Sequence, residues 1–407
     1  MESLKIALVS DWFFPSVGGI EYHIHDLATR LTSLGHDVHV ITRFGDYPDE
    51  NLPYEVHRFK GRITMESSHV SIGAGVLKRV NELYKREHFD VTHGHSIYSP
   101  LALGVANLSA GIRGVPSVVT GHSLLGDSIL NPVYITILRF SLRKVSSFIA
   151  VSDAVEKDMR SILGKSLGNR GIYLIPNGID TEFWKPPEDK EERKEAIGLR
   201  GVVVTTTSRL TKRKRIHVIP EIARRIKEEH GDGVTFVIIG DGPERSNIEQ
   251  LIKEYDVGDI VKLLGRQPRE RVREYLQATD IYLSPTIYEA FGIAALEALS
   301  CGVPVVANNH GGISEIVKHE STGLVSHNDQ GLMQNLMALI TNEEMREKMG
   351  RNARKSVENH FNWETLVLQV LDIYRTTMEQ ADDKPFTLYK LHQKIKKEIA
   401  NVSLFNL

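Results

Sequence analysis

Residues 5–42 read KIALVSDWFFPSVGGIEYHIHDLATRLTSLGHDVHVIT, and this stretch decides the class of fold. It contains two short apolar runs, Lys5 to Ser10 and Asp37 to Thr42. Between them a helical pattern runs from about Ile20 to Leu34 and is closed by Gly35. Two strands that flank a helix predict a parallel βαβ unit.

The same alternation of short apolar runs and helical patterns continues along the chain. The further runs that predict strands are 91–94, 117–120, 147–151, 202–207, 235–240, 261–264, 281–284 and 303–308. They predict an α/β protein with two Rossmann-like, doubly wound domains. Ligands of such sheets bind at the carboxyl ends of the strands, so we expect the two domains to face a central cleft.

Changes in composition indicate where the domains end. Residues 184–196 contain two prolines and many charged side chains, which predicts a linker between a domain at 1–183 and a domain at 197–361. Residues 362–380 predict an amphipathic helix that could pack on either domain, including by crossing back to the first. The basic tail, 381–407, fits either a solvated helix or a helix that lies on a membrane surface.

Length, charge and cysteine content exclude several classes of protein. The 407 residues carry 50 Lys and Arg against 52 Asp and Glu, a net charge of −2, so no overall positive field would attract nucleic acid. Cys301 is the single cysteine and cannot form an internal disulfide, which predicts a reducing, cytoplasmic setting. No window approaches the roughly 18 apolar residues of a membrane span, so any membrane contact is expected to be peripheral.

Gly18 and Gly19 open the first predicted helix. Backbone N–H groups at such a position can bind an anion or a sugar hydroxyl, although a turn with positive φ would also require glycine. The spacing is not the dinucleotide-binding G-x-G-x-x-G, and no P-loop sequence is present. Hydride transfer and P-loop hydrolysis are therefore disfavoured.

Three histidines follow neighbouring strands of the first domain. His93 and His95 end one predicted strand, and His122 ends the next, where doubly wound folds place ligand-binding groups. Structural histidines and a metal site are the alternatives. No Cys or carboxylate lies at ligand spacing beside these histidines, and the chain contains no D-x-D. We therefore expect no metal and no cofactor.

The second domain has a basic loop and two spaced glutamates. Arg209 precedes a run, Leu210 to Arg215, that is solvated or binds a diphosphate. Glu297 lies alone in an apolar segment and should have committed hydrogen-bond donors. Glu289 precedes a helix whose first turn we expect to contain three N–H groups, an anion site unless Glu289 forms only a structural ion pair. These N–H groups are those of Phe291, Gly292 and Ile293.

Together these residues resemble the retaining, metal-independent glycosyltransferases of family 4, which have the GT-B fold. The resemblance covers about residues 5–378, and its most specific element is the spacing Glu289-x7-Glu297. It implies that Arg209 and Lys214 bind the donor diphosphate, that Gly18 and Gly19 form the glycine loop, and that His122 contacts the donor sugar and phosphate. It also implies that Glu297 binds ribose hydroxyls and Glu289 sugar hydroxyls, whereas Arg215 replaces the usual glycine.

Within this family, residues 10–24 and 120–124 are most similar to the subgroup that transfers N-acetylglucosamine to phosphatidylinositol. The resemblance implies catalytic roles for His122, Arg209, Lys214 and Glu289. It implies transfer of a hexose from a nucleotide sugar, with UDP favoured, to a lipid acceptor at an anionic membrane surface, and His93 and His95 are candidates for acceptor binding. A soluble sugar or polyol phosphate is the alternative acceptor. A sugar-nucleotide epimerase, which would need no acceptor, and a catalytically inactive binding module are the alternative functions.

Overall fold

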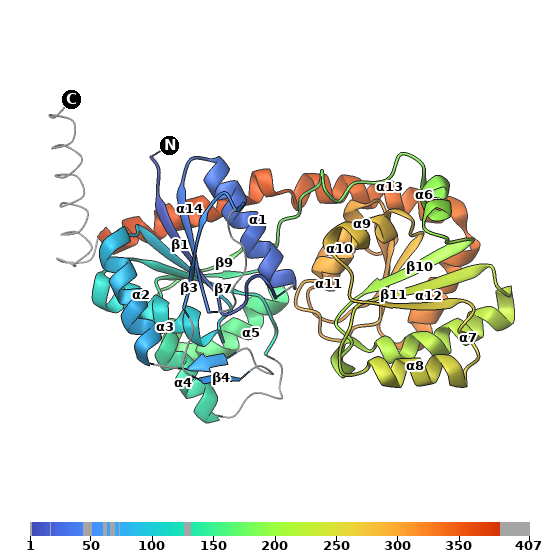
Figure 1. The fold of residues 1–407 in the computed structure, drawn as a ribbon, viewed down its shortest axis with the longest axis horizontal. Helices are drawn as coiled ribbons and strands as arrows, with labels where there is room; N and C mark the ends of the chain where they lie inside the picture. Colours follow the sequence, from blue (N-terminus) through green and yellow to red (C-terminus); the bar gives the residue numbers. More distant parts are fainter. Residues whose placement is uncertain are drawn as a thin grey trace. The chain divides into compact units, whose positions relative to one another are not determined.

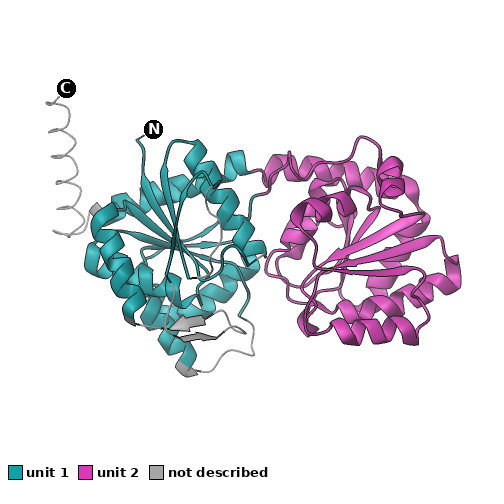
Figure 2. Ribbon diagram, in the orientation of Figure 1, with its two compact units in different colours: residues 1–178, 363–407 teal, residues 179–362 magenta. Residues whose placement is uncertain are grey.

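The computed structural model of the chain describes residues 2–16, 18–43, 51–59, 63–65, 70–72, 74–125 and 132–382. The chain divides into two compact units, unit 1 with residues 1–178 and 363–407 and unit 2 with residues 179–362 (Figure 2). Most of the predicted basic tail, 383–407, lies outside the described residues.

Unit 1 is built on a seven-stranded parallel sheet in the order β3-β2-β1-β6-β7-β8-β9 (Figure 1). Its strands are β1 (Lys5–Val9), β2 (Asp37–Thr42), β3 (Glu55–Arg58), β6 (Val91–His95), β7 (Ser117–Gly121), β8 (Ser147–Ala150) and β9 (Ile172–Leu174). A separate antiparallel pair consists of β4 (Ile63–Met65) and β5 (Val70–Ile72). All residues of β6 and β7 are buried, as expected for parallel strands that are covered on both faces.

Helices cover both faces of this sheet. The helices α1 (Gly19–Ser33) and α14 (Trp363–Asp382) share one apolar core with the sheet, and α2 (Ala74–Glu87) and α3 (Pro100–Leu108) share another. The remaining helical segments are a π-helix at Ser109–Arg113, α4 (Pro132–Leu142), α5 (Asp153–Leu163) and a 3-10 helix at Gly164–Leu167. The helix at 363–382 therefore belongs to unit 1, which is one of the two placements that the sequence left open.

Unit 2 has a six-stranded parallel sheet in the order β12-β11-β10-β13-β14-β15. Its strands are β10 (Val202–Thr207), β11 (Val234–Ile239), β12 (Val261–Gly265), β13 (Ile281–Ser284), β14 (Val305–Asn308) and β15 (Gly323–Ser326). Its α-helices are α6 (Lys190–Ala196), α7 (Ile219–His230), α8 (Arg245–Glu254), α9 (Arg269–Gln277), α10 (Ile293–Ser300), α11 (Ile313–Ile316), α12 (Asp329–Thr341) and α13 (Glu343–His360). Short 3-10 helices lie at Lys212–Lys214 and Ile216–Val218.

The predicted linker at 184–196 is part of unit 2. Trp184 is buried, and its carbonyl accepts a hydrogen bond from Ser300 Oγ. Lys194, in α6, lies 2.8 Å from Asp280, which anchors the helix to the start of β13. The many charged residues of this segment thus belong to a partly exposed segment that Trp184 and Lys194 anchor to unit 2. The chain passes from one unit to the other at 178/179 and at 362/363.

Two parallel α/β units confirm the predicted fold class. Five short strands were not predicted: β3, β4, β5, β9 and β15. Two of them, β3 and β9, are edge strands of the first sheet, and β15 is an edge strand of the second. Edge strands are short and only partly covered, so their sequences lack the continuous apolar run that marks a central strand.

Candidate functional site

Two histidines meet at the carboxyl ends of neighbouring strands in unit 1. His95 is the last residue of β6, and His122 directly follows β7, which pairs with β6 in parallel. Nδ1 of His95 lies 3.1 Å from Nε2 of His122, within hydrogen-bonding distance. The His93 ring lies next to that of His95, with centroids 4.3 Å apart, so the structure brings together all three histidines that the sequence singled out, at the end of the sheet where ligands bind.

Another imidazole, that of His23, comes from the first half of α1. Its ring centroid lies 4.8 Å from that of His122 and 5.5 Å from that of His95, and its other neighbour is the indole of Trp363 at 5.2 Å. Sequence reasoning missed His23. Its position in the sequence could have indicated it, because the helix after β1 begins near the carboxyl end of that strand, where doubly wound folds bind ligands.

Burial keeps these imidazoles neutral. It lowers the pKa of His122 to about 3, with Asn177 acting in the opposite direction, and it lowers the pKa values of His23 and His95 well below the usual range. Nδ1 of His23 and Nε2 of His95 are buried without a hydrogen-bond partner in the described part of the chain. A neutral imidazole has one donor and one acceptor nitrogen, and Nε2 of His122 is already paired with His95.

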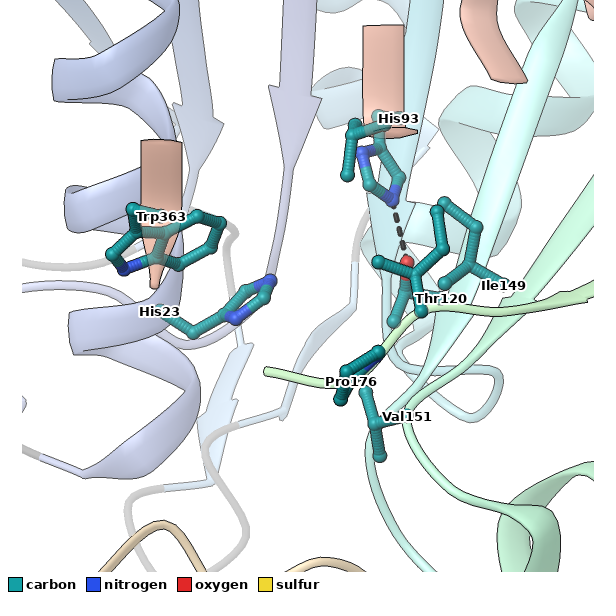
Figure 3. A pocket seen from close by; sticks show the side chains of 9 residues that line it. His23, His93, Thr120, Ile149, Val151, Pro176 and Trp363 are labelled. Carbon is teal, nitrogen blue, oxygen red and sulfur yellow. Dashed lines mark hydrogen bonds between the residues drawn. The ribbon is translucent and has the colours of Figure 1, made fainter. Parts of the chain in front are cut away.

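His93 has a different role from His95. Nδ1 of His93 lies 2.7 Å from the Tyr374 hydroxyl, and Nε2 lies 2.6 Å from Thr120 Oγ1, the contact that Figure 3 shows as a dashed line. Both ring nitrogens are thus used inside unit 1, which favours the structural interpretation of His93 over acceptor binding. His93, Thr120 and His23 line a cavity of about 10 Å³, enough for about one water molecule.

Gly18 lies against a neighbouring carboxylate. Its backbone is extended, with φ −167°, so the alternative of a turn with positive φ is wrong for this residue. A Cβ at Gly18 would lie 2.7 Å from Oε2 of Glu21, a buried side chain that accepts a hydrogen bond from Ser16 Oγ at 2.8 Å. Gly19 is the first residue of α1, one position earlier than the sequence predicted.

In unit 2, a lysine and a glutamate that are far apart in the sequence form an ion pair. Lys214 ends the 3-10 helix after β10, and its Nζ lies 2.5 Å from Oε2 of Glu289. Both side chains are mostly buried, with exposed fractions of 21% and 15%. Lys212 and Arg213 are exposed, so within the basic run the structure separates Lys214 from neighbours that are merely solvated.

Close backbone packing positions the loop that carries Arg209. Gly240 and Gly242 have positive φ, and a Cβ at Gly240 would lie 1.8 Å from the Ser208 carbonyl oxygen. A Cβ at Gly242 would lie 2.5 Å from the carbonyl oxygen of Leu210. These two glycines, which sequence reasoning did not connect with the basic loop, therefore hold the backbone on both sides of Arg209, whose side chain is exposed.

The turn between Glu289 and α10 differs from the prediction in one respect. The helix begins at Ile293 with Gly292 as its N-cap at φ 101°, so Phe291 lies outside the first turn. Phe291 is buried and packs against Phe361, with ring centroids 6.1 Å apart. The helix has no side-chain cap, which leaves N–H groups of its first turn available to an anion.

Glu297 lies on α10 and is partly buried, whereas the sequence suggested full burial. Its negative charge helps to raise the pKa of the Cys301 thiol, although burial of the thiol is the larger cause. Glu289 is held in place on the other side of the turn by backbone contacts, because its N–H donates to the His310 carbonyl at 3.2 Å and its carbonyl accepts from Gly312 at 2.7 Å.

Arg215 has a left-handed backbone conformation, which glycine adopts more readily than other residues. Its φ is 56°, in the left-handed region, and its guanidinium makes two hydrogen bonds to Asp329, at 2.9 and 2.6 Å. The ion pair with Asp329 therefore accompanies a backbone conformation that is strained for a residue with a side chain.

Within the described residues, two groups could hold a metal ion, His23 with His95 and His122, and His39 with Glu55 and His57. The first group contains no carboxylate, and its ligand atoms lie within 4.8 Å of one another.

The sequence matches two known families. Residues 187–356 match the glycosyl transferases group 1, and residues 17–183 match glycosyltransferase family 4. One phosphatidylinositol N-acetylglucosaminyltransferase subunit, from Arabidopsis thaliana, is 31% identical over 363 residues, which cover 85% of this chain and 78% of the relative. N-acetyl-alpha-D-glucosaminyl L-malate synthase of Bacillus anthracis is 27% identical over 398 residues, which cover 94% of this chain and 98% of the relative.

Solved structures share the fold. The crystal structure of Anabaena HepE in complex with UDP-glucose aligns with a TM-score of 0.77 at 21% identity, covering 92% of this chain and 100% of the other. At this level of identity the likeness concerns the arrangement of the strands and helices, and it supports the assignment of two Rossmann-like units.

Proposed function

The chain belongs to the group 1 and family 4 glycosyltransferases, enzymes that transfer a sugar from a nucleotide sugar, and we propose that its donor is a UDP-hexose and its acceptor a lipid. We propose transfer with retention of the anomeric configuration, with N-acetylglucosamine as the favoured sugar and a phosphoinositol-type head group as the favoured acceptor. The observation that carries the donor assignment is the ion pair between Lys214 and Glu289.

This ion pair supports a role in donor binding because both of its members have little solvent access. The Lys214 ammonium can interact with a diphosphate, while the second carboxylate oxygen of Glu289 remains able to accept hydrogen bonds from sugar hydroxyls. Arg209 and the first turn of α10 would add positive charge and N–H donors. These groups would stabilise the charge that develops on the leaving diphosphate.

Retention would follow from attack on the same face of the sugar that the diphosphate leaves. In the described part of the chain, the side chains that interact with His122 include His23, His95 and Asn177, which are neutral, rather than a carboxylate nucleophile. We therefore favour a front-face displacement over a covalent glycosyl-enzyme. His122 would contact the donor sugar and phosphate, and His95 would orient His122.

The surface of α4 supports a lipid acceptor. Ile137 and Phe140 are 55% and 62% exposed, and the guanidinium carbon of Arg143 lies 4.0 Å from the Phe140 ring centroid. Exposed apolar side chains beside Arg143 and Lys144 are suited to the interface of an anionic membrane, where each Lys or Arg contributes about 1 kcal/mol. No helix in the described ranges is both long and apolar enough to cross a membrane, so such an association would be peripheral, on the cytoplasmic face.

A soluble acceptor is the second candidate. The Bacillus anthracis relative is named for transfer to L-malate, and its alignment covers nearly all of both chains. A small carboxylate acceptor would need no membrane-binding surface.

A transfer assay with both acceptors distinguishes the candidates. The full chain is incubated with labelled UDP-N-acetylglucosamine and either phosphatidylinositol vesicles or L-malate. We expect labelled lipid, and we expect Phe140→Asp to reduce both co-sedimentation with vesicles and lipid labelling. Leu368→Asp, which changes an exposed leucine on α14, is the matched control and should leave both unchanged. Labelled malate with no vesicle binding at low salt would overturn the lipid assignment.

A further inference from the structure

Two neighbouring strands at one edge of the first sheet repeat the pattern acid-Val-His. The pattern is Asp37-Val38-His39 at the start of β2 and Glu55-Val56-His57 at the start of β3. The strands are parallel, with His39 opposite Glu55 and Ile41 opposite His57. Because alternate residues of a strand share a face, the two acids and the two histidines all lie on the same face of the sheet.

The side chains converge to a triangle of three potential ligand atoms. Nδ1 of His39 lies 2.8 Å from Nε2 of His57, and both nitrogens lie 3.5 Å from Oε2 of Glu55. Ligand atoms about 2.0–2.2 Å from a tetrahedral Zn²⁺ are about 3.3–3.5 Å apart. The three atoms therefore need to move by only a few tenths of an ångström to coordinate one ion.

A second carboxylate already orients His39. Its Nε2 lies 3.1 Å from Oδ1 of Asp37, and Oδ2 of Asp37 lies 2.9 Å from Nζ of Lys5. A metal-binding histidine commonly donates its second ring N–H to a carboxylate, which fixes the tautomer and directs the other nitrogen to the ion. This arrangement leaves the lone pair of Nδ1 of His39 directed at the triangle.

The remaining features also suit a metal ion. His39 is buried, His57 is partly buried, and Glu55 is 65% exposed, so the triangle is rigid on one side and open to solvent on the other. In the metal-free protein, Nε2 of His57 would carry a proton and donate a hydrogen bond to Nδ1 of His39. When the proton moves to Nδ1 of His57, both facing nitrogens have a lone pair for the ion.

We propose that His39, Glu55 and His57 bind one Zn²⁺ ion, with a water molecule as the fourth ligand. Two imidazoles and one carboxylate form a donor set that zinc accepts and that Mg²⁺ does not favour. The ion would link the edge strand β3 to β2. The triangle lies on the edge strand β3 and its neighbour β2, whereas His95 and His122 lie at the carboxyl ends of β6 and β7, so zinc here would stabilise the fold without entering sugar transfer.

The second histidine group is a weaker candidate for the same ion. His23, His95 and His122 are almost fully buried, and no carboxylate is part of the group. Zinc binding at that group would remove His122 from its proposed role, so the two sites make opposite predictions for activity.

The test uses the full chain after removal of metal with EDTA and dialysis. Zinc titration by calorimetry should give one ion per chain, Co²⁺ should give the visible absorption of a tetrahedral site, and Mg²⁺ should not compete. Glu55→Gln and His57→Gln should weaken zinc binding about 100-fold, and Asp37→Asn about 10-fold to 100-fold. Glu55 is exposed, so Glu55→Gln should fold normally. If His57→Gln fails to fold, the zinc affinity of Glu55→Gln still tests the proposal.

Two controls separate this site from other histidines. His319→Gln changes an exposed histidine beside Glu320 and should bind zinc like the unmodified chain. His23→Gln should also bind zinc normally, and zinc should raise the unfolding temperature without reducing sugar transfer. Unchanged affinity in Glu55→Gln and His57→Gln, or loss of binding in His23→Gln alone, would overturn the proposal. The result does not depend on which sugar or acceptor the enzyme uses.

Discussion

Nζ of Lys214 lies 2.5 Å from Oε2 of Glu289, so a loop that follows β10 is joined to the turn that precedes α10. The two residues are 75 positions apart in the sequence. The pair places one positive charge beside the uncapped first turn of a helix, at the carboxyl ends of two adjacent strands, β10 and β13. A diphosphate at this position would meet a fixed positive charge and N–H donors together.

Replacement of Lys214 should reduce turnover much more than replacement of its neighbour. We expect Lys214→Ala to lower kcat about 100-fold, because it removes a positioned charge from the leaving group. Lys212→Ala should change kcat by less than about twofold, because Lys212 is exposed and solvated. Steady-state kinetics with a UDP-sugar measures both variants. If Lys214→Ala lowers kcat no more than Lys212→Ala does, Lys214 has no special role and is solvated like its neighbours.

Glu297→Gln should weaken binding of the nucleotide sugar while the fold is retained. A carboxylate that accepts hydrogen bonds from ribose hydroxyls contributes about 1.5 kcal/mol, so Kd should rise about 10-fold. Glu249→Gln, on the exposed face of α8, is the control. Calorimetric titration with UDP-sugar that gives equal Kd values for Glu297→Gln and the unmodified chain would remove Glu297 from ribose binding.

Arg215→Gly should leave stability nearly unchanged. The substitution relieves about 1 kcal/mol of left-handed backbone strain and loses an ion pair with Asp329 that contributes a similar amount or less. Asp329→Asn should destabilise the unmodified chain more than it destabilises Arg215→Gly. Equal effects of Asp329→Asn in both backgrounds, measured by urea unfolding, would show that the two residues are not coupled.

Acidification should destabilise the protein from about pH 6.5 downward. The pKa values of His93 and His122 are about 3 in the folded chain because of burial, against about 6.5 when unfolded. Between these values the unfolded chain binds more protons, so the free energy of unfolding falls as pH falls, by at most about 1.4 kcal/mol per pH unit for each histidine. Urea unfolding at pH 7.5 and 5.5 measures the change, and His93→Gln should reduce it. A slope that is the same in His93→Gln would contradict the assignment.

Chelation should leave sugar transfer intact. The sequence contains no D-x-D, and we assign the stabilisation of the leaving group to Arg209, Lys214 and the first turn of α10. Transfer rates before and after EDTA treatment should agree, although the unfolding temperature should fall if zinc is removed from His39, Glu55 and His57. Loss of transfer in EDTA that a divalent ion restores would contradict metal-independent catalysis.

Residue type and spacing do not report side-chain contacts, so the contacts of the predicted site residues come from the structure. The sequence pattern singled out Glu289 and Glu297, whereas Lys214 was separated from Lys212 only by the family resemblance, and the structure shows that Lys212 is exposed. The sequence grouped His93 with His95, whereas Tyr374 and Thr120 use both nitrogens of His93. It missed His23, which reaches the strand ends from a helix.

The sequence by itself determined the alternation of strands and helices, the existence of two doubly wound units and the family. These properties depend on apolar runs and glycine positions that are local in the chain, and a buried parallel strand must be apolar along its whole length. Only the tertiary structure decided that Trp184 and Lys194 belong to unit 2, that Arg215 has a left-handed backbone conformation, and that His39 meets His57. Such contacts depend on the register of neighbouring strands and on the rotamers that close packing selects, and residues far apart in the chain settle both together.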